Sequence, residues 1–198
     1  IAGEQSHRLE STNQTTMTRA LIFLFILTGI QSCLPSKDRK AEFPNILFIL
    51  SDDHAVQALS CYGSRINRTP HLDRLAREGA MLTNCFVTNS ICAPSRASII
   101  TGKYGHMHGK VTNILPFDSD QVTSPQLLRA AGYETAVIGK WHLDPSPSGF
   151  TFWKILTGYN GQGNYYNPEF NEMGNLKMYN GYVTNLITDF AIDWLEHR

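Results

Sequence analysis

Two short apolar runs, residues 46–50 and 135–138, each lead into a group of polar side chains, and this pattern constrains the fold most. The side chains at the two ends are Asp52, Asp53, Lys140 and His142. An unbroken apolar run of strand length is typical of a parallel strand covered on both faces. The carboxyl ends of parallel strands open onto one crevice. We therefore expect an α/β fold with a mostly parallel central sheet flanked by helices on both faces, and the two polar groups close together.

Helix signals separate these runs along the chain. Thr69 as N-cap and Pro70 at the first helical position start a helix that ends at Gly79. Connections through helices make parallel pairing of the strands the default. The other expected elements are a strand at 81–87, a helix that follows the segment 92–96 and ends near Gly102, helices from Ser124 to Gly132 and over 186–196, and an extended loop region at 146–180.

Composition excludes two classes of protein. The 198 residues include 17 Lys and Arg against 17 Asp and Glu, so the formal net charge is zero. A protein held on nucleic acid by phosphate neutralisation would carry a basic excess, so we expect no nucleic-acid partner. With 42% apolar and 11% aromatic residues the chain is not compositionally disordered.

The N-terminal part has the pattern of an export signal. The apolar run 20–30 is too short to span a bilayer, which takes about 20 residues. Met17 and Arg19 precede it, so residues 17–33 have the form of a signal peptide. Residues 1–16 are then an upstream extension and residues 34–44 a linker. The end of the signal resembles that of a bacterial lipoprotein, which predicts a lipid anchor at Cys33; ordinary cleavage near Ser32 is the alternative.

Two groups of residues have the chemistry of a site. Asp52 and Asp53 suit a hard cation, but they supply only part of its shell, and a helix N-cap with a solvated turn is an equally simple interpretation. Cys92 stands just before a helix, with free backbone N–H groups nearby and Arg96 four residues on. Both features stabilise negative charge, which indicates an anion-binding nucleophile. Cys61 and Cys85 could pair in an oxidising compartment or stay free.

The segment Cys92-Ala93-Pro94-Ser95-Arg96 resembles the signature of the sulfatase family, within the alkaline-phosphatase-like superfamily, in its cysteine type. Three further segments are similar to family motifs in the same order: the metal-binding strand at 45–53, the first helix at 69–76 and the second signature at 139–142. The resemblance makes residues 45–198 the N-terminal part of a sulfatase catalytic domain. The family's remaining ligands have no counterpart here, which implies an incomplete site without useful turnover.

The resemblance implies a mechanism and its partners. A formylglycine-generating enzyme would convert Cys92, and the aldehyde hydrate would attack sulfate esters. Arg96 and His142 would be catalytic and Lys140 would bind the substrate. Asp52, Asp53 and Cys92, the last as formylglycine, would hold Ca²⁺ rather than Mg²⁺. Together with the export signal this implies a periplasmic or outer-membrane, cell-surface lipoprotein of a Gram-negative bacterium.

The aromatic and amide side chains of residues 161–168 suit sugar recognition. This segment resembles the sulfatases that act on sulfated glycans, of the N-acetylglucosamine-6-sulfatase and the heparan or mucin types, so a sulfated glycan is the expected substrate. Two alternatives stay open. One is a phosphodiesterase or phosphonate hydrolase of the same superfamily. The other is a non-catalytic surface lipoprotein that binds sulfated glycans.

Overall fold

The computed structural model describes residues 43–144, 146–158 and 161–198. The predicted signal peptide, the lipid anchor at Cys33 and most of the linker lie outside these residues. The chain divides into two compact units, residues 1–50 and 51–198, and of the first only residues 43–50 are described. Within the described residues, no helix combines the length and apolar character needed to cross a membrane.

Two of the predicted strands are absent from the described residues. Residues 46–50 and 81–87 form no regular structure, and their large apolar side chains are exposed, up to 94% for Phe86. A strand needs a hydrogen-bonded neighbour, and no described strand pairs with either segment. The prediction was wrong here because an apolar run indicates that a segment can be buried, but it does not indicate which strand the segment would pair with.

The helices of residues 51–198 follow the sequence signals closely. The predicted helices appear as α2 (Pro70–Glu78), α3 (Cys92–Thr101), α5 (Ser124–Ala130) and α6 (Val183–Glu196). Short turns of helix occur at η2 (Val56–Ala58), η3 (Ser60–Tyr62) and α4 (Gly105–His108). One detail differs: Thr69 precedes α2, but its hydroxyl bonds to Ser60 and Asp73 rather than to the first N–H groups of the helix.

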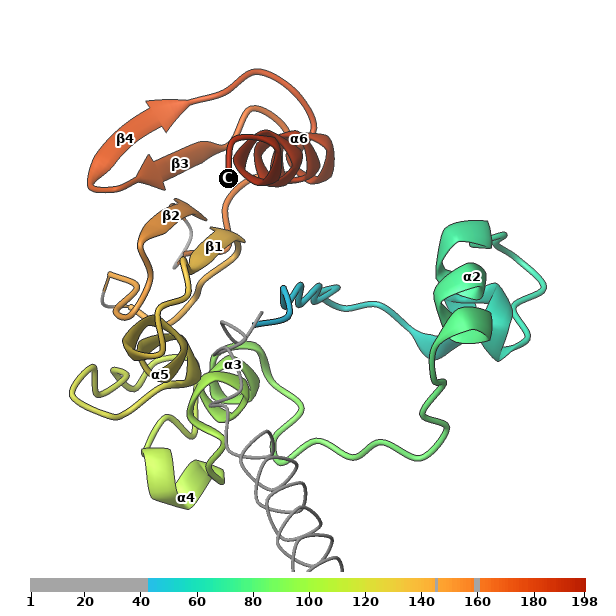
Figure 1. Cartoon of the computed structure of the whole chain (residues 1–198), viewed down its shortest axis with the longest axis horizontal. Coiled ribbons are helices and arrows are strands. Elements are labelled where there is room, and N and C mark those ends of the chain that lie inside the picture. The colour runs from blue at the N-terminus through green and yellow to red at the C-terminus, as the bar shows by residue number, and fades with distance from the viewer. Residues whose placement is uncertain (1–42, 145, 159–160) are drawn as a thin grey trace, which may run out of the picture. The chain divides into compact units, whose positions relative to one another are not determined.

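The described residues contain one sheet of four strands, in the order β1-β2-β3-β4 (Figure 1). The strands are β1 (Ala136–Gly139), β2 (Phe152–Leu156), β3 (Glu169–Glu172) and β4 (Asn175–Met178). The β1–β2 pair is parallel, whereas β2–β3 and β3–β4 are antiparallel. The α/β class is confirmed, but this part of the sheet is mixed rather than mostly parallel.

Residues 146–180 are not the extended loop that we expected, because they contain β2, β3 and β4. The β3–β4 hairpin turns at Met173 and Gly174, both with positive φ (49° and 95°). A two-residue turn with positive φ at both positions matches the twist of a hairpin. Met-Gly is a weak signal for such a turn, and the strands have only four or five residues, too few for a clear period of two.

Two apolar clusters hold the sheet and its helices together. The first joins Ala93 and Ala97 of α3 to Trp141, Leu143 and Trp153. The second lies between the sheet and α6, which runs beside the strands in Figure 1. β1 ends at Gly139, with a φ of 108°, where a Cβ would lie 3.3 Å from the side chain of Ile187. The chain therefore leaves β1 under α6 and enters the segment 140–144.

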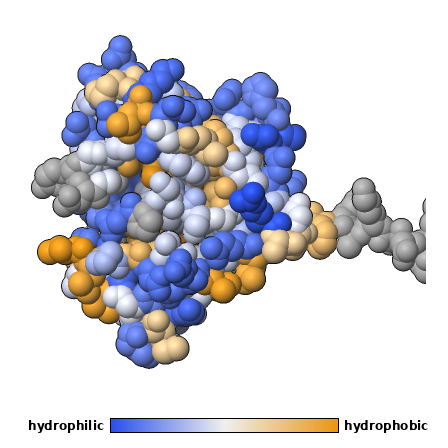
Figure 2. Space-filling view, turned by 90° about the vertical axis from the view of Figure 1, so that its left-hand side faces the viewer, coloured by the Kyte–Doolittle hydropathy of each residue, from blue (hydrophilic) through white to orange (hydrophobic). Residues whose placement is uncertain are grey.

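Apolar side chains also remain on the surface of the described residues. Orange patches interrupt the hydrophilic surface in Figure 2. Ile114 is 92% exposed, and Leu176 and Met178 of the edge strand β4 are 63% and 60% exposed. Exposed apolar area on this scale is typical of surfaces that contact further protein.

Candidate functional site

The cysteine of the signature occupies the first position of α3. No side chain of the preceding residue caps this helix. Instead, the Asn113 Oδ1 atom accepts a hydrogen bond from the Ala93 N–H at 3.0 Å, and Pro94 has no N–H to satisfy. The start of α3 is thus fixed from outside the helix, and Cys92 stands at the end where the helix dipole favours negative charge.

Lys140 directs its ammonium group into the centre of the site. The Nζ atom donates to Asp52 Oδ2 at 2.6 Å, to Gln162 Oε1 at 3.3 Å and to Cys92 Sγ at 3.5 Å. An ammonium has three donors, so these contacts use all of them. The two polar groups predicted from the ends of the apolar runs do converge, since Asp52 and Lys140 form an ion pair across 88 positions of sequence.

Arg96 joins both partners of this ion pair to α3. Its Nη1 atom donates to the Lys140 carbonyl oxygen at 2.6 Å, and its Nη2 atom lies 3.4 Å from Asp52 Oδ1. The Arg96 Nε atom is buried and has no hydrogen-bond partner within the described residues. A guanidinium fork with a donor left over is suited to an additional anionic ligand.

The electrostatics at Asp52 favour its charged form. Burial raises the pKa of this carboxyl, but the bond and charge of Lys140, followed by those of Arg96, outweigh burial and hold the pKa below its usual value. Both oxygens already face cations, and the side chain is 41% exposed. Asp52 is therefore an anion at neutral pH that balances the two positive groups around Cys92.

The described residues offer the type of donor atom that a divalent metal prefers, but they do not supply a complete coordination shell. The carboxylate oxygens of Asp52 and Asp53 suit a hard cation, which takes six or more oxygen ligands. However, Asp53 makes no hydrogen bond or ion pair within the described part of the chain, and those residues hold no cluster of three or more His, Cys, Asp or Glu that could bind a metal. The two aspartates could thus form one side of a coordination shell.

His142 is buried, with 3% of its surface exposed, and its Nδ1 atom has no hydrogen-bond partner among the described residues. Burial is the largest cause that lowers its pKa below the usual 6.5. The charges of Lys140, Arg96 and Lys110 lower it further, and Asp144 opposes them. The imidazole is therefore neutral at pH 7, which is the form that can accept a proton.

Sequence reasoning missed three residues around this site, and it placed a fourth, Gln162, in the sugar-binding segment 161–168 without its contact to Lys140. Gln162 holds the ammonium of Lys140, and Asn113 caps α3. Lys110 and Asp144 form an ion pair with an Nζ–Oδ2 distance of 2.6 Å. The position of Asp144, two residues after His142, was a weak signal, but the others lie in loops without a periodic pattern. Cys61 and Cys85 are both free thiols in the structure.

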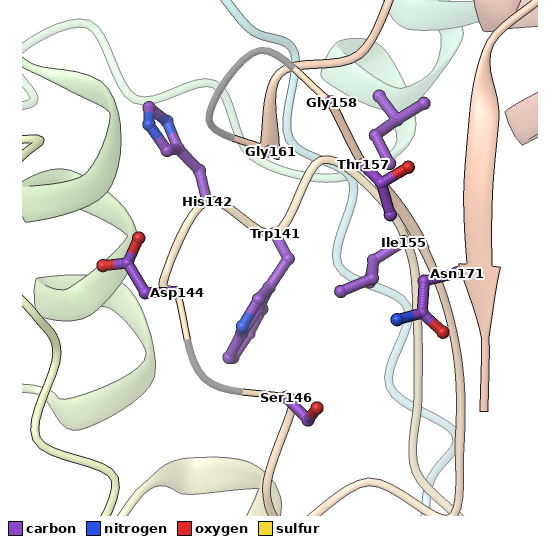
Figure 3. A pocket seen from close by; sticks show the side chains of 10 residues that line it. Trp141, His142, Asp144, Ser146, Ile155, Thr157, Gly158, Gly161 and Asn171 are labelled. Carbon is purple, nitrogen blue, oxygen red and sulfur yellow. The ribbon is translucent and has the colours of Figure 1, made fainter. Parts of the chain in front are cut away.

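A pocket of about 330 Å³ borders the segment that follows β1. Trp141 and His142 line one side, with Ile155 and Asn171 across from them, and the His142 ring turns away from that opposite wall (Figure 3). Its described lining includes neither Cys92 nor Lys140. The charged groups therefore converge outside the described lining of this pocket.

The fold and the site together define an α/β protein in which Lys140, Arg96 and Asp52 converge beside a cysteine at a helix start. The sulfatase family profile matches residues 44–198, which includes every residue of this site. The chain belongs to the sulfatase family.

Relatives agree with this assignment. An N-acetylglucosamine-6-O-sulfatase of Bacteroides thetaiotaomicron is 47% identical over 170 residues, 86% of this chain and 30% of the relative. An N-acetylgalactosamine-6-O-sulfatase of the same bacterium is 39% identical over 64% of this chain and 26% of that protein. A solved structure, described as a complex with its substrate D-glucosamine-2-N,6-O-disulfate, shares 50% identity and a TM-score of 0.77, and the match covers 78% of this chain and 31% of that chain. The chain thus spans about a third of the length of these proteins.

Proposed function

We propose that the protein hydrolyses sulfate esters on glycans, with Cys92 as the precursor of the nucleophile. One observation supports this most directly: Lys140 Nζ lies 3.5 Å from Cys92 Sγ while it pairs with Asp52. A cation that contacts both the nucleophile position and a carboxylate is placed to neutralise a sulfate bound there. The membership in the sulfatase family, which generally uses formylglycine, agrees with this role.

The proposed reaction proceeds in two steps at residue 92. A maturation enzyme converts the Cys92 side chain to the aldehyde of formylglycine with an external two-electron oxidant such as O₂; the C–S bond breaks and the sulfur leaves at the sulfide level. Water then adds to the aldehyde to give a hydrate. One hydroxyl of the hydrate attacks sulfur and gives up its proton, while the S–O bond to the sugar breaks and the leaving oxygen takes up a proton to give an alcohol. The second hydroxyl then loses its proton, the C–O bond to sulfate breaks, and the aldehyde re-forms. Division into two steps lowers the barrier of each.

Each charged or polar side chain of the site has a separate role in this reaction. Lys140 and Arg96 bind the sulfate oxygens, and the unpaired Arg96 Nε is available for one of them. The neutral imidazole of His142 accepts the proton of the second hydroxyl. Asp52 and Asp53 would hold one side of a Ca²⁺ ion, or less favourably Mg²⁺, which would supply Lewis-acid stabilisation of the sulfate charge.

The segment that follows Gln162 supports a glycan as substrate. Tyr165 and Tyr166 are 74% and 70% exposed, and the Tyr166 ring lies 5.3 Å from that of Tyr182. Exposed aromatic faces close in sequence to an amide that contacts Lys140 suit a sugar with a sulfate group. The substrates named for the relatives, which include a 6-O-sulfated glucosamine, agree with this proposal.

The test of this proposal is mass spectrometry of the Cys92 peptide, on the full-length gene product made in a host with the maturation enzyme. We expect loss of the sulfur and an aldehyde that hydrazides capture, whereas Cys61 and Cys85 remain thiols. A Cys92 that stays fully unmodified in that host would contradict the mechanism and favour a phosphoryl-transfer or purely glycan-binding protein.

The pH dependence of turnover tests the role of His142. The neutral imidazole is the active form, and the pKa of His142 lies below 6.5, so kcat/KM should stay level down to that pH and fall only in more acidic solution. His106→Gln, a change at an exposed histidine, should leave this acidic limb in place. An acidic limb centred above pH 6.5 would contradict the assignment.

A further inference from the structure

A lysine outside the proposed chemistry is buried completely beside the site. Lys110 is 0% exposed, although lysine is almost never buried without partners. Its ammonium donates to Asp144 Oδ2 at 2.6 Å, to the Asn113 carbonyl oxygen at 3.3 Å and to the Leu115 carbonyl oxygen. Three donors thus meet three acceptors, and the charge is paired, so this lysine is a fixed internal cation.

The hydrogen-bond partners of Lys110 connect it to two parts of the site, the start of α3 and the segment 140–144. On one side, Asn113 accepts from the Lys110 ammonium through its carbonyl and from the Ala93 N–H through its side chain. Ala93 directly follows Cys92, so this bond sets the start of α3. The loop that begins at Lys110 therefore reaches the nucleophile through a chain of two hydrogen bonds.

On the other side, Asp144 ends the segment that holds Lys140 and His142. Trp141, His142 and Leu143 between them are buried, so the segment is packed along its length. Asp144 itself is 49% exposed, with a φ of 50°, and Lys110 is its ion-pair partner. The ion pair fixes the far end of this segment, as the bond from Arg96 to the Lys140 carbonyl fixes the near end.

We infer that Lys110 is a positioning residue: its buried ammonium holds the start of α3 and the segment 140–144 in place relative to each other, so that Cys92 faces Lys140. Its catalytic consequence rests on the proposed sulfatase function, but the coupling of the two segments does not. An error of about 1 Å in the placement of reacting groups can cost about 100-fold in rate.

The electrostatics distinguish this role from simple space filling. The charged groups around His142 are Lys140, Arg96, Lys110 and Asp144. Among them Lys110 lowers the pKa of the imidazole and Asp144 raises it. A methionine at position 110 would fill a similar volume but would remove the charge, whereas an asparagine at position 144 would remove the opposite charge. The two changes should therefore shift the acidic limb of kcat/KM in opposite directions.

The experiment compares Lys110→Met and Asp144→Asn with Lys177→Met, which removes an exposed lysine of β4. In the full-length gene product we expect both test variants to lose about 10-fold to 100-fold in kcat per formylglycine, with KM within about threefold of the parent. The acidic limb should move to higher pH in Lys110→Met and to lower pH in Asp144→Asn. Lys177→Met should change none of these quantities.

Hydrogen exchange measured by mass spectrometry gives a readout that does not need activity. Peptides that contain Ala93 and residues 141–144 should exchange faster together in Lys110→Met, whereas α2 should be unchanged. Should Lys110→Met fail to fold, the exposed partner change Asp144→Asn decides the question. A folded variant with unchanged exchange in both segments and an unmoved acidic limb would overturn the inference. A wild-type protein inactive on sulfate esters would overturn the proposed function and leave the exchange result to decide the positioning role.

Discussion

Cys92→Ala should abolish sulfate-ester hydrolysis by the full-length gene product, with a loss of at least about 10³-fold in kcat, equivalent to about 4 kcal/mol of activation free energy. Without a hydrate at residue 92 the covalent route is closed, and neither the binding cations nor His142 can replace the nucleophile. Steady-state turnover of a glucosamine 6-sulfate measures the loss. Isothermal titration of the same sugar measures whether the cationic centre still binds it.

Two variants make this result specific to the aldehyde. Cys92→Ser keeps a nucleophilic oxygen but is a poor precursor of the hydrate in a cysteine-type host, so it should be as inactive as the alanine variant. Cys85→Ala removes an exposed free thiol and should retain full activity. Sulfate-ester turnover by Cys92→Ala within about tenfold of the parent would refute covalent catalysis at this position.

Lys140→Met is the second change with a large expected effect. It removes the ammonium that contacts Asp52, Gln162 and Cys92, and with it the charge that would face the sulfate. Loss of one such electrostatic group typically costs about 10²-fold to 10³-fold in rate, and we expect that range in kcat/KM. The pKa of Asp52 should rise as well, because Lys140 is the strongest of the groups that lower it.

The predicted rise in the pKa of Asp52 can be detected in the pH dependence of the stability of the fold. A carboxyl with a lowered folded pKa stabilises the fold above its unfolded pKa, and this contribution disappears as the pH falls through the folded value. Lys140→Met should lose part of it, by a small amount because Asp52 is 41% exposed. Lys177→Met is the control, and Lys140→Arg should not restore activity since a planar fork differs from a point charge. A Lys140→Met protein with kcat/KM within about threefold of the parent would contradict the role.

Local signals in the sequence were sufficient for most of the helices. The helices α2 and α5 begin at Pro70 and Ser124 as predicted, because capping and proline effects act over a single turn. The helix α3 begins earlier than predicted, since Cys92 is its first residue rather than a residue that precedes it. Asp52 and Lys140 do meet, but residues 46–50 form no strand, so the argument from parallel strands that predicted this contact was not confirmed. The ion pair needs only that the two segments meet.

Contacts between residues far apart in the sequence could not be predicted from local sequence patterns. The hairpin at Met173 depends on backbone twist, and the strand β2 on a neighbour whose position no local pattern encodes. Lys110 and Asn113 lie in a loop where a lysine is ordinarily solvated, so nothing in the sequence indicated burial. Such residues are found by asking which atoms satisfy each buried donor, and this requires coordinates.

The backbone conformation at His142 is unfavourable for a residue with a side chain, although the proposed reaction needs the imidazole at this position. Its φ of 56° belongs to the left-handed region, where any side chain with a Cβ costs about 1 kcal/mol or more relative to glycine. A glycine would adopt this backbone conformation without that cost, but in the proposed mechanism only the imidazole can accept a proton there. Under that mechanism the histidine trades stability for activity, and selection for heat resistance alone would be expected to remove it.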